Sequence, residues 1–252
     1  MNKKNVTIQY LKALAIVMVI DDHCGQKLGI MTSLFPYNSF YMPLFVFISG
    51  YLFKDTTLLE NIKKALKRIF LPYVLVNVVG ILLSRIFIEL GLHWSAPLNI
   101  RTIFSCLFLN PISSMNGPAW YAIMYFWLFV AYSVIDCVFK KGNTLGQIVA
   151  FISLLGIGIV NIHLCRNGIL DYELGNFIFD YRLLLVRTMF YLPFLHFGRM
   201  FRELENKLSI DASRYFYVAM ICVMMNLVLL ISIGQENIIF SATSNMRSFK
   251  SD

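Results

Sequence analysis

Two ionisable side chains lie in the first hydrophobic segment of the chain, a lysine near its start and a histidine near its end. An α-helix rises ~1.5 Å and turns ~100° per residue, so Lys12 and His23 fall within about 20° of one helix face and ~16 Å apart along the axis. Ionisable residues inside a membrane-spanning helix usually face a protein interior or a watery cavity, which makes this face a candidate functional site. In the alternative interpretation, Lys12 extends to the lipid headgroups and His23 only marks the end of the helix.

His23 has the chemistry of a general base. A neutral imidazole carries a basic nitrogen near physiological pH and can remove a proton from a hydroxyl nucleophile. The preceding Asp21 and Asp22 point ~200° and ~100° away from it on a helix, so we expect any orienting partner on another helix or in the loop that follows. Two other histidines in helical segments, His163 and His196, fit hydrogen-bonded packing better than catalysis.

A basic patch precedes the third hydrophobic segment. Lys64 and Arg68 are four residues apart, which makes them neighbours on a helix surface and suits them to phosphate groups. The same charges fit a topology anchor that meets anionic membrane lipid, and charge alone favours that interpretation. Both interpretations stay open.

A third group of residues is expected inside the protein at about the depth of His23. It comprises Arg85, Arg187 and the pair Trp120 and Tyr121. Arg187 is suited to stabilise an oxyanion or to orient a polar substrate, and Trp120 could stack on a sugar ring. A place in the aromatic belt at the membrane boundary is the alternative for Trp120.

No metal site and no familiar soluble-enzyme motif is predicted. The five cysteines contain no CxxC pair and no partnered spacing, so neither a zinc site nor a disulfide framework is indicated. The chain also lacks HExxH, a GxSxG elbow, a Walker loop and GxGxxG. We expect no bound cofactor.

Composition places these residues in a membrane protein. The 252 residues are 58% hydrophobic and 14% charged, outside the usual range of soluble domains. Seven apolar segments predict an all-α, polytopic transmembrane helix bundle with about seven spans. They are residues 7–27, 39–54, 69–91, 118–139, 144–164, 182–201 and 215–233. We expect a transmembrane domain over 1–234 and a polar tail over 235–252, with the apolar piece 99–109 as a re-entrant or interfacial helix.

The net charge of +8 is carried between the hydrophobic segments, where lysine and arginine set topology, so nucleic-acid binding is not expected. Cations gather before the first segment and in alternate connections thereafter. The positive-inside rule therefore predicts a multi-pass protein of the inner (plasma) membrane with a cytoplasmic N-terminus. The first segment resembles a signal peptide, but residues 21–23 stand where a small-residue cleavage site would be, so we expect it to be retained.

Five ordered blocks, over about residues 8–202, resemble the membrane-bound acyltransferase-3 family, and in particular its sugar O-acetylase branch, which includes fucose 4-O-acetylase-like proteins. Lys12 and His23 are similar to its Arg/Lys-x10-His motif. Residues 40–51 resemble its FHMPLFFFISGY block, with Tyr41 where histidine is common. The remaining blocks are residues 68–73, like its R-x-x-x-P-Y entry to the third helix, residues 118–121, like its WF/WY block, and residues 187–198, like its PFFxxG helix.

The resemblance implies a membrane O-acyltransferase that moves an acyl group, usually acetyl from acetyl-CoA, to a hydroxyl of a cell-surface or lipid-linked carbohydrate such as an exopolysaccharide. It implies that His23 is catalytic, that Lys12 belongs to the donor path, and that Lys64 and Arg68 face the CoA phosphates. Family members carry more spans than this chain, so we expect a truncated product or a short variant. A transporter or flippase for a glycan or acyl carrier, and an inactive fragment, are the alternatives.

Overall fold

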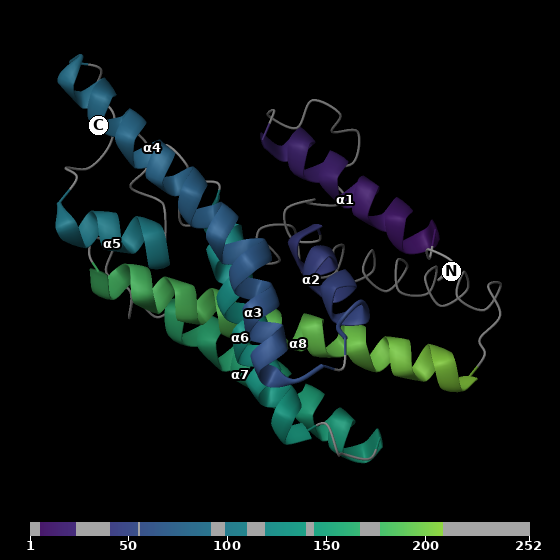
Figure 1. Cartoon of the computed structure of the whole chain (residues 1–252). Coiled ribbons are helices and arrows are strands. Elements are labelled where there is room, and N and C mark those ends of the chain that lie inside the picture. The colour runs from purple at the N-terminus through teal and green to yellow at the C-terminus, as the bar shows by residue number, and fades with distance from the viewer. Residues whose placement is uncertain are drawn as a thin grey trace, which may run out of the picture. The chain divides into compact units, whose positions relative to one another are not determined.

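A computed structural model describes residues 6–23, 41–54, 56–91, 99–109, 119–139, 144–166 and 177–208. Every regular element in these ranges is helical, as the sequence predicts (Figure 1). Contacts divide the chain into two compact units. Unit 1 combines Met1–Phe53 with Phe197–Asp252, and unit 2 is Lys54–His196.

Unit 1 is built from helices at both ends of the described chain. Helix α1 (Val6–His23) packs against α2 (Tyr41–Tyr51). The last part of α8 (Phe177–Leu208) also packs on α2, because the Phe47 ring lies 5.5 Å from the ring of Phe197 and 5.7 Å from that of Phe201. Gly198 lets the two helix backbones touch, since its Cα faces the backbone of α2 directly.

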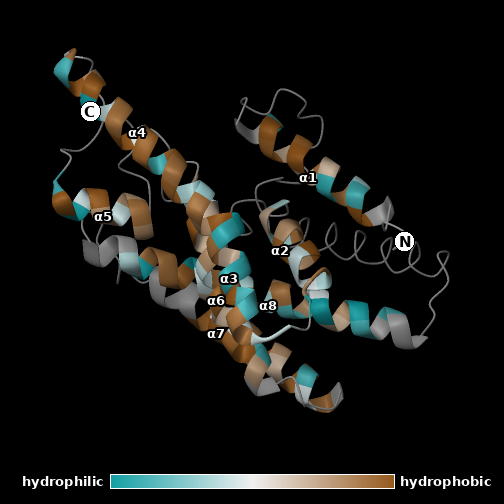
Figure 2. Cartoon of the chain, viewed as in Figure 1, coloured by the Kyte–Doolittle hydropathy of each residue, from teal (hydrophilic) through white to brown (hydrophobic). Residues whose placement is uncertain are grey.

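Unit 2 begins with a helix that is longer than the sequence predicts. Helix α3 (Leu58–Ala65) continues through a π turn, η2 (Leu66–Phe70), into α4 (Leu71–Glu89). The predicted segment starts at residue 69, but Thr57 caps an earlier start: its hydroxyl accepts from the backbone N–H of Glu60 at 3.4 Å. Hydrophilic residues gather on α3, whereas hydrophobic ones predominate along α4 (Figure 2).

The short helix α5 (Ile100–Phe108) confirms the helix expected at residues 99–109. Asn99 caps it by accepting from the backbone N–H of Thr102 at 2.8 Å. The Tyr73 hydroxyl of α4 donates to the carbonyl of Cys106 at 2.5 Å. The buried side of α5 holds Thr102, Ser105 and Cys106, while Ile100 is exposed. Whether this helix is re-entrant or interfacial stays a prediction.

Helices α6 (Trp120–Phe139), α7 (Thr144–Arg166) and the first part of α8 complete unit 2. Helix α6 packs against α3, η2 and α7. A buried cluster of Ala65, Tyr73, Ile123 and Phe126 joins α6 to the long helix. This core holds the N-terminal half of α6 in place, where the candidate site residue Trp120 lies.

Six of the seven predicted segments coincide with helices, and residues 215–233 lie outside the described part of the chain. Two described helices, Leu58–Glu89 and Trp120–Cys137, are long and apolar enough to cross a membrane. Tyr41–Tyr51 and Leu145–Val160 are apolar but shorter. The count of seven spans therefore stays a prediction, and two spans are supported by length and composition.

Candidate active site

Helix α1 carries Lys12 and His23 without interruption. It runs to His23 as its last residue, so the backbone register places both positions on one side of the helix, as predicted. Lys12 is half-buried and lies beside the face that Ile8 and Ala15 bury. The side chain of His23 lies outside the described part of the chain, and its catalytic role stays a prediction.

Asp21 is a buried carboxyl group that was not predicted as a site residue. Only 4% of its surface is exposed. It follows Lys12 by nine positions, about 180° around the helix, so it belongs to the opposite face. Its residue type could have predicted this, because a carboxylate in an apolar segment is costly to bury and marks a position that the protein must stabilise.

Arg187 and Trp120, both predicted as substrate-binding residues, lie together in unit 2. The guanidinium carbon of Arg187 is 4.1 Å from the centroid of the Trp120 ring, and Arg187 is only 2% exposed. This is a cation–π contact between the start of α6 and α8. One face of the indole is therefore covered by the guanidinium, and a sugar ring could stack only on the other.

Three tyrosines extend this pair: Tyr121, whose ring lies 6.0 Å from that of Trp120, was expected at this depth without an assigned role, and Tyr125 and Tyr191 were not predicted. The rings of Tyr121 and Tyr125 are stacked, with centroids 5.9 Å apart. Tyr191, one turn after Arg187, is buried and lies within electrostatic reach of Arg187 and Tyr121. The four-residue spacings from 121 to 125 and from 187 to 191 were the available signal. We call Trp120, Tyr121, Tyr125, Arg187 and Tyr191 the arginine–aromatic cluster.

The other predicted cations lie on the surface of unit 2. Lys64 and Arg68 are exposed, and the ammonium of Lys64 donates to the Thr56 hydroxyl at 3.4 Å. The expectation that Arg85 is buried is wrong: its side chain is 64% exposed and forms an ion pair with Glu89 at 3.0 Å. A partner one turn away on the same helix lets Arg85 stay at the surface.

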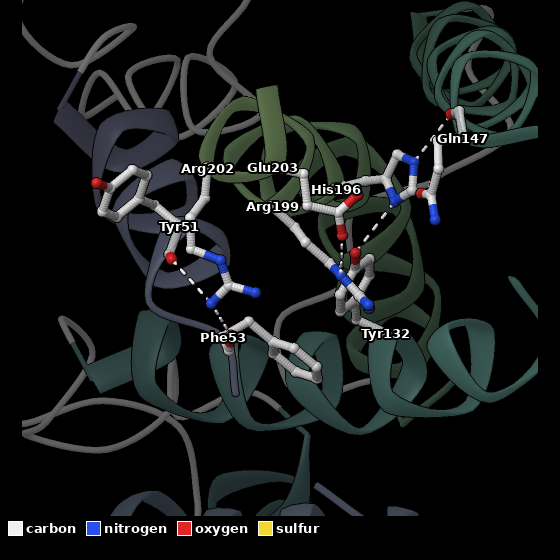
Figure 3. Close-up of polar contacts among 8 residues, drawn as sticks. All are labelled: Tyr51, Phe53, Tyr132, Gln147, His196, Arg199, Arg202 and Glu203. Carbon is white, nitrogen blue, oxygen red and sulfur yellow. Dashed lines mark hydrogen bonds and ion pairs between the residues drawn. The ribbon is translucent and has the colours of Figure 1, made fainter. Parts of the chain in front are cut away.

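His196 is a buried packing residue, in agreement with the sequence interpretation (Figure 3). Its Nε2 lies 3.0 Å from the backbone carbonyl of Gln147, and its Nδ1 lies 3.1 Å from the Tyr132 hydroxyl. Because a carbonyl can only accept, Nε2 carries the hydrogen, and in the neutral ring the Tyr132 hydroxyl donates to Nδ1. The histidine thereby ties α6, α7 and α8 together.

Unit 1 contains a second polar network at the end of α2 (Figure 3). The Tyr51 hydroxyl donates to the Glu205 carboxylate at 2.7 Å. The guanidinium of Arg202 donates to the backbone carbonyls of Tyr51, at 3.3 Å, and of Phe53. A cation on the last carbonyls of a helix stabilises its C-terminus. Arg202 therefore has a structural role in unit 1.

The described helices and side chains indicate the class of protein. The described part of the chain is all-helical, with apolar helices of membrane-spanning length, ionisable residues in its first helix and an arginine–aromatic cluster around the buried Arg187. The acyltransferase domain model of the acyltransferase-3 family matches residues 5–248, and the chain belongs to this family. It is therefore a membrane acyltransferase. No curated protein and no solved structure matches the chain.

Proposed function

We propose that this protein transfers an acyl group, namely acetyl from acetyl-CoA, to a hydroxyl of a cell-surface or lipid-linked carbohydrate in the inner membrane. The observation that supports this most is the unbroken helix α1, which carries Lys12 and His23 within a chain of the acyltransferase-3 family. Transfer from a charged acyl donor to a neutral hydroxyl requires a general base for the hydroxyl proton, which His23 can supply. A cation such as Lys12 can attract the negatively charged donor.

The proposed reaction uses His23 as the general base. Its imidazole takes the proton of the sugar hydroxyl while that oxygen forms a bond to the thioester carbonyl carbon. The tetrahedral oxyanion is stabilised by Arg187 or by backbone N–H groups. When the carbon–sulfur bond breaks, the CoA thiolate leaves and receives the proton from the imidazolium. Lys12 lies along the path of the donor.

The composition of the arginine–aromatic cluster supports a carbohydrate acceptor. Aromatic rings stack on the apolar faces of sugars, and phenol hydroxyls and a guanidinium offer hydrogen bonds to sugar hydroxyls. Trp120 is half-buried, so part of its ring is accessible beside the Arg187 guanidinium. In this proposal Trp120 and Arg187 orient the acceptor.

The test compares intact protein with His23→Ala at matched membrane levels. Membranes receive labelled acetyl-CoA, and label in the extracted glycan is counted. We expect the variant to lose at least about a hundredfold in transfer, the usual contribution of a general base. His163→Ala is the matched control and should transfer normally.

Unchanged glycan acetylation in His23→Ala would overturn the assignment. Glycan transport that survives this substitution, without any acyl transfer by the intact protein, would instead support a transporter.

A further inference from the structure

The π turn of residues Leu66–Phe70 has an identifiable cause. Pro72 lacks an N–H, and its ring clashes with the carbonyl four residues earlier, that of Arg68. A turn with i→i+5 hydrogen bonds relieves this conflict, and the N–H of Leu71 accordingly donates to the carbonyl of Leu66. The helix from Leu58 to Glu89 continues past the proline without ending.

The π turn keeps the buried side of the long helix in register. The buried residues are Asn61 and Ala65 in α3 and Tyr73, Asn77, Gly80 and Ser84 in α4. Two regular α-helical turns take about seven residues, but Tyr73 follows Ala65 by eight. The wider turn accommodates the extra residue, so the buried stripe of α4 continues that of α3.

The same turn aligns four cations on the side away from the buried stripe. Lys63, Lys64, Lys67 and Arg68 are all exposed. In a regular helix a step of four residues overshoots one turn by about 40°, whereas a π turn removes most of this overshoot. Lys67 therefore lies above Lys63, and Arg68 above Lys64. We call these four residues the cation square.

The cation square shares its side of the helix with exposed apolar residues. Leu59, Lys63, Lys67, Leu71 and Leu75 follow one another at intervals of four. Leu59, Leu71 and Leu75 are 62%, 52% and 59% exposed. In a spanning helix, exposed leucines face lipid, so the cations lie on the lipid side, next to the point where the apolar surface of α4 begins.

From this placement we propose that the cation square binds the phosphate groups of anionic phospholipid headgroups, in the leaflet where α4 begins. Long cationic side chains at the end of an apolar helix surface extend to the headgroups. A soluble donor that enters the protein would instead require cations on the buried side. The inference does not depend on the acyl-transfer reaction, and it gives Lys64 and Arg68 a different ligand from the CoA that the family resemblance implies.

The test uses the full-length protein released from nanodiscs that contain equal amounts of phosphatidylglycerol and phosphatidylcholine. Native mass spectrometry counts the lipids that stay bound. Changing all four residues of the square to Gln should lower retained phosphatidylglycerol at least about tenfold, since each cation near a surface contributes about fivefold. Phosphatidylcholine retention should not change. The control changes the same number of cations elsewhere, Lys3, Lys4, Lys140 and Lys141, to Gln, and an equal loss there would overturn the proposal.

Two further experiments test whether lipid binding needs the π turn and whether CoA is the ligand instead. Deletion of Leu66 combined with Pro72→Ala keeps all four cations and both buried stripes but removes the π turn. Retained phosphatidylglycerol should fall several-fold, and full retention would overturn the role of the turn.

CoA binding, measured by equilibrium dialysis, should be the same in the Gln variant and the intact protein. Loss of CoA binding with phosphatidylglycerol retained would overturn the lipid assignment.

Discussion

At the scale of single residues, the contact between Arg187 and Trp120 changes how both are understood. Each was predicted from its type and depth, but only the structure shows that the guanidinium lies on the indole. A buried arginine needs a stabilising environment, and an aromatic face supplies part of it. Trp120 thus holds the Arg187 guanidinium in position, so a substitution of the indole ring affects the proposed roles of both residues.

We expect Trp120→Ala to lower acyl transfer by about two- to thirtyfold, the range that a lost cation–π contact of about 0.5–2 kcal/mol gives. Trp120→Phe keeps a ring with a weaker cation–π interaction and should retain more activity than Trp120→Ala. The measurement is labelled acetate in glycan at matched membrane levels. Equal activity of Trp120→Ala and the intact protein would contradict a role for this pair.

The hydrogen bonds of His196 predict a loss of stability. Tyr132→Phe removes the hydroxyl that donates to Nδ1 and leaves that buried nitrogen without this hydrogen bond. The free energy of unfolding should fall by about 1–3 kcal/mol. Thermal unfolding in detergent, followed by size-exclusion chromatography, checks this. An unchanged unfolding midpoint would show that the Tyr132–His196 hydrogen bond contributes nothing to stability. If acyl transfer were lost at that unchanged midpoint, Tyr132 would have a catalytic role instead.

At the scale of elements, the close approach of α2 and α8 depends on one glycine. A Cβ at position 198 would overlap the backbone carbonyl of Phe47 and lie 2.8 Å from the backbone N of Tyr51. Backbone atoms cannot rotate away as side chains do, so the helices must separate.

Gly198→Ala should therefore destabilise the protein by at least about 1–3 kcal/mol, the usual cost of overpacking. The control is Gly156→Ala in α7, where a Cβ has no neighbour within 4 Å. That change should be neutral or stabilise the helix by about 1 kcal/mol. Thermal unfolding of both variants in the same detergent makes the comparison. Equal midpoints would show that α2 and α8 do not depend on the small residue.

The elements were more predictable than their contacts. Apolar length indicated most helices, and α1 falls within the segment predicted at residues 7–27 apart from its first residue. The π turn was missed because it arises from Pro72 acting on the carbonyl of Arg68, which no periodicity reports. Arg85 was misplaced because its pairing with Glu89 makes exposure favourable. Tyr191 was missed because its importance depends on which face of α8 meets α6.

At the scale of the whole molecule, the topology inferred from loop charges can be tested directly. We expect green fluorescent protein fused after Lys141 to fluoresce, because that connection is predicted to be cytoplasmic. Alkaline phosphatase fused after Trp94 should be active, because that connection is predicted to lie outside. Fluorescence and enzyme activity of whole cells report both fusions. Phosphatase activity at position 141 would contradict the predicted orientation.

The two units have a consequence for how the protein is made. Unit 1 takes its helices from the first 53 residues and from residue 197 onward, and all of unit 2 lies between these in the sequence. On the ribosome, α2 must therefore wait for Phe197, Phe201 and Arg202 until unit 2 has been synthesised. Unit 2 has its complete sequence first and can assemble during translation. A nascent chain that stalls before residue 197 would leave α2 without these contacts. We expect such a chain to be a substrate for quality-control proteases.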